Sequence, residues 1–141
     1  MNDVTLGVSE MNLRRLTPSE RIWLWRRRRP STTGRVLGRG GSRMSMGEAA
    51  AHLNLPTATY VAAESGNDPD IVQIVLDLLG DDVKQRPSVA ELCALARRRS
   101  RVEVDDLCRA MGGISRPTFF ARETEGSPEL IDLWRARGYE F

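Results

Sequence analysis

Residues 46–66 read MGEAAAHLNLPTATYVAAESG, and their pattern decides the expected fold. Ser45 and Glu48 have the spacing of a capping box, which starts a helix. That helix carries one apolar stripe at helical spacing, formed by Met46, Ala49, Ala50 and Leu53. Residues 54–56 predict a tight turn, and a second helix runs from Thr57 until Gly66 stops it. Two short helices joined by such a turn predict a helix-turn-helix unit.

This stretch resembles the helix-turn-helix of the Cro/repressor (XRE) family of DNA-binding regulators. Small residues stand where the two helices of that family touch, apolar residues stand at its core positions, and its closing Glu-x-Gly and following proline are present. The matching residues are Ala49, Ala50, Leu53, Leu55, Tyr60, Glu64, Gly66 and Pro69. The resemblance covers about 25 residues and implies that the second helix enters the major groove of DNA. Residues 17–29 would be the family's first helix, but the connection of residues 31–43 is longer than the family's usual few residues.

A second unit with similar spacing follows at residues 104–126. Its apolar stripe repeats the first one, with an extra glycine, Gly113, in the turn. The repeating positions are Leu107, Cys108, Met111, Ile114 and Phe119. The segment of residues 115–118 (SRPT) is similar to the Ser-Arg-x-Thr segment in the recognition helices of small phage and transposon regulators. A plain three-helix bundle has the same apolar stripe, so the pattern alone leaves both interpretations open.

Helix signals outside these units complete an all-α fold. Thr17 and Glu20 form a further capping box, and Pro30 ends the helix that they start. Further helices are predicted over residues 70–79, 89–99 and 129–137, and the first of these is apolar on nearly every side. We therefore expect two small helix-turn-helix units packed through apolar helices. They comprise residues 1–82, with an Arg/Gly-rich insertion at residues 30–44, and residues 83–141.

Charge is distributed unevenly along the chain, although the net charge is only +2. Residues 1–43 hold ten arginines and three acidic residues, whereas residues 44–96 hold two basic and eight acidic residues. Arginine supplies 20 of the 21 basic residues, which favours phosphate binding because guanidinium groups stay charged and bind phosphate in a bidentate manner. A high-GC coding sequence has the same effect on composition, so this bias adds little by itself.

The candidate DNA contacts lie on both recognition helices and on the arginine-rich segments. The outward positions of the first recognition helix are neutral, so this helix either reads thymine methyl groups weakly or is purely structural. Arg116, near the start of the second recognition helix, is the candidate reader of guanine. The arginine run at residues 26–29 is either a solvated helix end or a phosphate contact, and the loop of residues 31–43 is either a flexible surface loop or an arm on the DNA. The candidates are Thr57, Ala58, Thr59, Ser115, Arg116, Thr118, Arg122, Arg26, Arg27, Arg28, Arg39 and Arg43.

The sequence contains no catalytic or metal-binding pattern, so we expect neither an enzyme nor a bound cofactor or metal. Its glycine-rich loop has neither Walker nor dinucleotide-binding spacing, and its adjacent acidic pairs, at residues 81–82 and 105–106, point apart on a helix. Cys93 and Cys108 lack a CxxC partner and are expected to be buried and reduced, and His52 is expected on a helix surface. No segment resembles a signal peptide or a membrane span, which indicates the cytoplasm of a bacterial host.

Together these features predict a transcriptional regulator that binds double-stranded DNA sequence-specifically, as repressor or activator of a phage or bacterial operon. Tandem units in one chain would read two successive faces of the major groove as a monomer, whereas a homodimer through the helix of residues 71–79 (Ile71 to Leu79) would read a palindromic operator. The acidic middle section and the neutral first recognition helix favour an alternative, a protein-interaction module such as an antirepressor or an inhibitor of a host factor. Salt dependence separates the two, because affinity for DNA falls steeply with salt.

Overall fold

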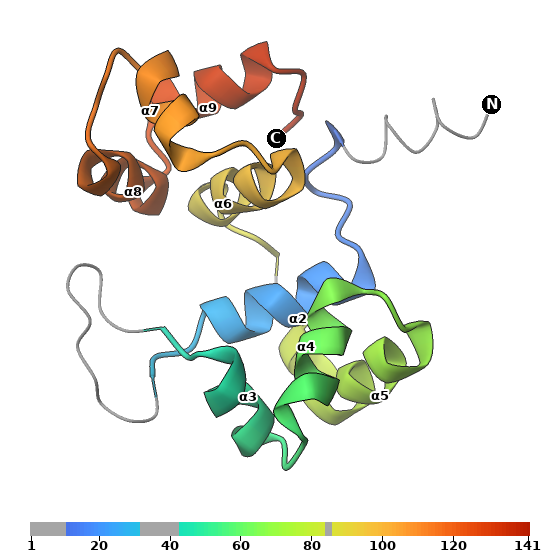
Figure 1. Cartoon of the computed structure of the whole chain (residues 1–141). Coiled ribbons are helices and arrows are strands. Elements are labelled where there is room, and N and C mark those ends of the chain that lie inside the picture. The colour runs from blue at the N-terminus through green and yellow to red at the C-terminus, as the bar shows by residue number, and fades with distance from the viewer. Residues whose placement is uncertain (1–10, 32–42, 84–85) are drawn as a thin grey trace. The chain divides into compact units, whose positions relative to one another are not determined.

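Two helical units make up the described part of the chain, which comprises residues 11–31, 43–83 and 86–141 of the computed structural model (Figure 1). One unit is formed by the described residues of the range 16–86, and the other combines residues 87–141 with residues 11–15. The described residues form helices and turns, with two isolated bridges but no strand. The predicted all-α class is therefore confirmed.

Capping signals in the sequence set the helices of the unit of residues 16–86, which we call the α2–α5 unit. Its elements are α2 (Pro18–Arg27), α3 (Met46–His52), α4 (Thr57–Ser65), α5 (Pro69–Leu79) and the 3₁₀ helix η1 (Gly80–Val83). Helices α2 and α3 both begin with a complete capping box, formed by Thr17 with Glu20 and by Ser45 with Glu48. Helix α4 ends at Gly66, whose φ of 75° lies in the left-handed region that favours glycine.

The second unit, the α6–α9 unit, begins its helices in the same manner. Its elements are α6 (Val89–Ser100), α7 (Val104–Ala110), α8 (Arg116–Glu125) and α9 (Pro128–Ala136). Ser88 and Glu91 form the capping box of α6, and serine hydroxyls cap α8 and α9 as well. The α-helices begin and end within two residues of the predicted positions. Helix α2 ends at Arg27, with Arg28 as its C-cap, and therefore stops before Pro30.

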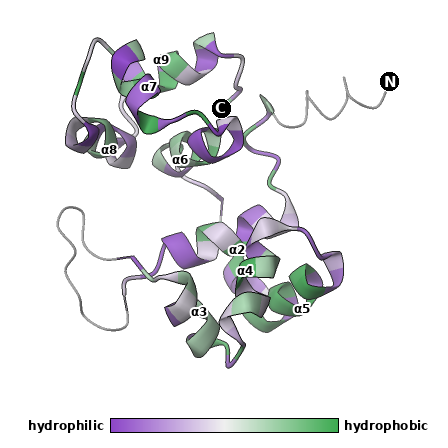
Figure 2. Ribbon diagram, viewed as in Figure 1, coloured by the Kyte–Doolittle hydropathy of each residue, from purple (hydrophilic) through white to green (hydrophobic). Residues whose placement is uncertain are grey.

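Each unit buries its own hydrophobic core. In the α2–α5 unit α2 packs against α4 and α5, and the buried cluster comprises Ile22, Trp25, Met44, Ala49, Ala50, Tyr60, Ala63, Val72, Val75 and Leu79. In the α6–α9 unit α6 packs against α8 and α9, and fully buried side chains include Leu13, Leu92, Cys93, Leu95, Leu107, Phe119, Leu130 and Trp134. Cys93 and Cys108 are free and buried, as predicted. Helix α5 is rich in apolar residues (Figure 2), and it also exposes two of them, Ile74 and Leu78.

The boundary between the units differs from the expected division after residue 82. Residues 11–15 belong to the α6–α9 unit, because the Leu13 amide donates to the Glu140 carbonyl at 3.0 Å and the Leu13 side chain is fully buried. Arg99 also donates to the Asn12 carbonyl at 3.0 Å. These partners are more than 80 residues apart in the sequence, and helical periodicity carries no information about such pairing.

The expected insertion at residues 30–44 lies partly outside the described residues, because residues 32–42 are not described. Its two ends are held together by the Met44 amide, which donates to the Arg29 carbonyl at 3.0 Å, and by an isolated bridge between Pro30 and Arg43. Met44 is buried in the core of the α2–α5 unit, so it belongs to the packed fold rather than to the insertion.

Candidate nucleic-acid interface

Two helix-turn-helix pairs, α3–α4 and α7–α8, carry the surfaces that the sequence assigns to DNA. In the first turn the Leu55 amide donates to the Ala50 carbonyl at 2.8 Å, and Asn54 adopts a φ of 58°. The second turn contains one more residue, and both Gly112 and Gly113 adopt positive φ values, 89° and 83°. The extra residue is accommodated there because two successive glycines tolerate a left-handed backbone.

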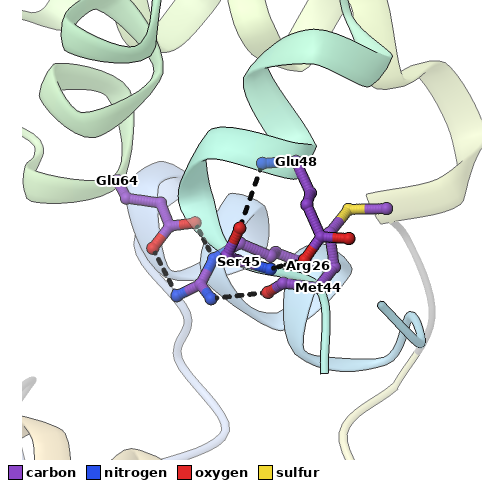
Figure 3. A network of polar contacts seen from close by, with 5 residues as sticks. All are labelled: Arg26, Met44, Ser45, Glu48 and Glu64. Carbon is purple, nitrogen blue, oxygen red and sulfur yellow. Dashed lines mark hydrogen bonds and ion pairs between the residues drawn. The ribbon is translucent and has the colours of Figure 1, made fainter. Parts of the chain in front are cut away.

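A buried ion pair fastens α4 to α2. Arg26 donates from Nε and Nη2 to the two carboxylate oxygens of Glu64 at 2.5 and 3.0 Å, and from Nη1 to the Met44 carbonyl at 3.0 Å (Figure 3). The Glu64 side chain is 2% exposed. Burial lowers the pKa of the Arg26 guanidinium, but its hydrogen bonds and attraction to Glu64 outweigh burial, so the net pKa shift is upward. The guanidinium therefore stays charged, and its hydrogen bonds to Glu64 hold the second helix of the pair in place.

The α6–α9 unit repeats this ion pair in the same register. Arg97 of α6 donates from Nε and Nη2 to the carboxylate of Glu123 in α8 at 2.8 and 3.1 Å, and the Glu123 side chain is also 2% exposed. Each arginine stands nine residues after the N-cap of its helix. Each glutamate stands four residues after a buried aromatic residue, Tyr60 or Phe119. The two units therefore follow one plan, in which α2 to α5 correspond to α6 to α9.

The exposed start of α8 carries a concentration of polar side chains. Arg116 is the first residue of α8, and its Nε donates to Asp105 of α7 at 2.7 Å. The hydrogen bond with Arg116 lowers the pKa of the Asp105 carboxyl and raises that of the guanidinium. The Ser115 hydroxyl caps α8 by accepting from the Thr118 amide, and the hydroxyls of Ser115 and Thr118 lie 2.9 Å apart. Arg122 lies further along α8 and is half-exposed.

The outer face of α4 has a different chemistry. Thr57 and Ala58 are exposed, Thr59 is half-buried, and Val61 is 40% exposed. None of the exposed positions 57, 58 and 61 carries a charge. At these three positions α4 exposes the hydroxyl of Thr57 and the methyl groups of Ala58 and Val61, but no long polar side chain.

Two members of the arginine run at residues 26–29 are held by carboxylates of the protein. Arg26 is turned inward and gives three of its five N–H donors to Glu64 and Met44, so we do not retain it as a candidate phosphate contact. Arg29 donates to Asp82 at 3.1 Å, and its guanidinium lies 4.6 Å from the centre of the Trp25 ring. Arg26 thus links α2 to α4. Arg29, two residues after the end of α2, links this part of the chain to η1.

The other two arginines of the run contact an aromatic ring and a backbone carbonyl. Arg27 is half-buried, and its guanidinium lies 5.5 Å from the centre of the Trp23 ring. Arg28 is also half-buried and donates to the Arg86 carbonyl at 3.2 Å. Arg43 is exposed at the end of the loop, and Arg39 lies outside the described residues. Among the described residues, the candidate phosphate contacts of the α2–α5 unit are Arg27, Arg28 and Arg43, and Arg39 stays a prediction.

Sequence reasoning missed the partners of two site residues. The sequence pattern places Arg26 in a run that is either a solvated helix end or a phosphate contact, although its offset from the N-cap equals that of Arg97 and marks both as members of a repeated pair. The spacing of Asp105 and Asp106 indicates only that the two carboxylates point apart, and Asp105 binds Arg116 across the turn. No local pattern indicates this contact, because its two residues belong to different helices.

Comparisons of the chain with protein-family models, with curated proteins and with solved structures give no match. Among the described residues, none of the helices has both the length and the apolar character needed to span a membrane. The same residues contain no group of three or more His, Cys, Asp or Glu side chains that could hold a metal ion. What distinguishes the site is an exposed arginine at the start of the second helix of a helix-turn-helix pair.

Proposed function

We propose that the chain binds double-stranded DNA sequence-specifically and regulates transcription of a phage or bacterial operon, as repressor or activator. The observation that carries this proposal is the exposure of Arg116 at the N-terminal end of α8. Helix-turn-helix proteins contact base edges from this end of the second helix. An arginine matches the two acceptors, O6 and N7, that guanine presents in the major groove. The proposal involves binding without a catalytic step.

The two units take different roles in this proposal. Helix α8 reads bases, since it carries Arg116, whereas α4 offers only neutral groups. The α2–α5 unit contributes phosphate contacts that are independent of sequence, through Arg27, Arg28 and Arg43. Contacts to the phosphate backbone of DNA set the affinity and the register of the protein on the duplex, and contacts to bases set the sequence specificity.

The proposal is tested by selecting bound fragments from a random DNA library and then measuring gel shifts at two salt concentrations. A recurrent selected motif, bound more tightly than random DNA and less tightly at the higher salt, supports the proposal. The absence of a shift on any DNA at low salt contradicts it.

A second candidate function is a protein-interaction module, and the exposed apolar residues favour it. Ile74 and Leu78 stand one turn apart on α5 and are each 53% exposed.

The same side of α5 supports a homodimer that would read a palindromic site. Sedimentation velocity of the wild type and of the Ile74→Ser/Leu78→Ser variant tests the dimer. A dimer that the substitutions dissociate supports it, and a wild-type monomer at high concentration contradicts it.

A further inference from the structure

The exposed ion pair between α7 and α8 links the two helices of the second helix-turn-helix pair. Asp105 lies in the first turn of α7, and Arg116 is the first residue of α8. The Arg116 Nε lies 2.7 Å from Asp105 Oδ1, and both side chains are 59% exposed. The pair therefore lies on the surface at the end of α8 that the proposed function directs at DNA.

The geometry of this pair leaves the two Nη atoms of Arg116 available to bind another acceptor. A guanidinium carries five N–H donors, of which Nε contributes one and the two Nη atoms contribute four. Asp105 accepts from Nε, and the described part of the chain offers the two Nη atoms no hydrogen-bond acceptor. Two parallel donors at the Nη edge match O6 and N7 of guanine. A residue that holds Nε therefore constrains the arginine without using the edge that reads a base.

We propose that Asp105 is a positioning residue that holds Arg116 ready for guanine and weakens binding to all other sequences. This inference rests on the proposed function. An unrestrained arginine loses rotamer freedom when it binds, and holding it in advance reduces that loss. The carboxylate is repelled by DNA phosphates at every sequence, and this repulsion is offset only where Arg116 finds guanine.

The neighbouring residue provides a matched control. Asp106 is also exposed on α7, and it forms an ion pair with Arg109 on the same helix rather than with α8. Replacing either aspartate by asparagine changes the net charge by the same amount at nearly the same place. General electrostatic effects on DNA binding are therefore shared by Asp105→Asn and Asp106→Asn, whereas positioning of Arg116 belongs to Asp105 alone.

The experiment compares Kd values of the full chain for its selected DNA site and for random DNA at one salt concentration. We expect Asp106→Asn to tighten both by a similar factor, roughly 2-fold, so that the ratio of the two Kd values is unchanged. We expect Asp105→Asn to tighten binding to random DNA by the same factor but to weaken binding to the selected site by roughly 5-fold, so that the ratio falls about 10-fold. Equal ratios for the two variants overturn the inference while leaving the proposed function intact.

A second measurement separates positioning from a defect in folding. Asp105→Asn is introduced into the Arg116→Ala background, where there is no arginine left to position. We expect the ratio of Kd values to be the same with and without Asp105→Asn in that background. A ratio that still falls overturns the inference, because the aspartate then acts by another route. If the wild type shows no preference for any DNA, the proposed function and this inference fail together.

Discussion

At the scale of single residues, two buried glutamates fasten the second helix of each helix-turn-helix pair. Glu123 is 2% exposed, and its carboxylate accepts two hydrogen bonds from Arg97. Removing one partner of a buried ion pair costs about 3–5 kcal/mol. Arg97 retains some contact with water, so the loss should be smaller than this range. We expect Glu123→Gln to lower the free energy of unfolding of the α6–α9 unit by about 2 kcal/mol. Urea unfolding, with hydrogen exchange resolved along the chain, measures this loss.

Glu125→Gln is the control for this loss, because Glu125 lies on the same helix and is exposed. Its effect on the free energy of unfolding should stay within about 0.5 kcal/mol. Equal effects of the two substitutions would show that the ion pair does not stabilise the unit. The corresponding pair of Arg26 and Glu64 predicts a matching loss in the other unit for Glu64→Gln.

The exposed Asp105 carboxyl gives a prediction about pH. Its pKa is lowered mainly by the hydrogen bond from Arg116, so the folded state holds its proton less tightly than the unfolded chain. The pair therefore stabilises the fold above the unfolded pKa of aspartate, and this contribution is lost as the pH falls through the folded pKa. Carboxyl NMR titration should show a low pKa that rises in Arg116→Ala. An unchanged pKa in that variant would mean that the pair does not form in solution.

At the scale of elements, α4 and α8 occupy corresponding places in the two units but expose different side chains. The exposed positions 57, 58 and 61 of α4 are neutral, whereas α8 begins with the exposed Arg116. The end of α2 and the two residues after it carry four consecutive arginines, of which Arg26 binds Glu64 and Arg29 binds Asp82.

The proposed function predicts that Arg27 and Arg28, at the end of α2, contribute to the salt dependence of DNA binding. The double substitution Arg27→Gln/Arg28→Gln should weaken binding to all sequences and reduce the slope of log K against log salt by about 1–2, because up to two phosphate contacts are lost. Gel shifts over a range of salt measure the slope. Arg21→Gln is the control, since Arg21 is an exposed charge on the same helix but outside the run. A slope that does not change would show that the run is a solvated helix end.

At the scale of the whole molecule, the chain crosses between its two units twice. Residues 11–15 belong with residues 87–141, and residues 16–86 form the unit between them. The N-terminal segment therefore contributes to the stability of the C-terminal helices. A division of the chain by sequence order would separate residues that fold together.

This arrangement predicts that a substitution near the N-terminus destabilises the C-terminal unit. Leu13 is fully buried there, and Leu13→Ala should cost about 2–5 kcal/mol, as is usual for a large core residue. Hydrogen exchange should report faster opening of α6 and α9, with little change in α3 and α4. Leu16→Ala, three residues later, is the control and should affect the α2–α5 unit instead. The opposite pattern would contradict the division into units.

Capping boxes, terminal glycines and apolar periodicity act over only a few residues, so the order and bounds of the α-helices could be predicted from the sequence alone. Thr17, Ser45 and Ser88 each begin a helix as predicted, and the glycines at residues 112–113 lie in the predicted second turn. The sequence did not predict which charges form buried pairs, where the units divide, or that Asp105 lies beside Arg116. These features depend on how helices distant in sequence pack together, and local propensity carries no information about that packing.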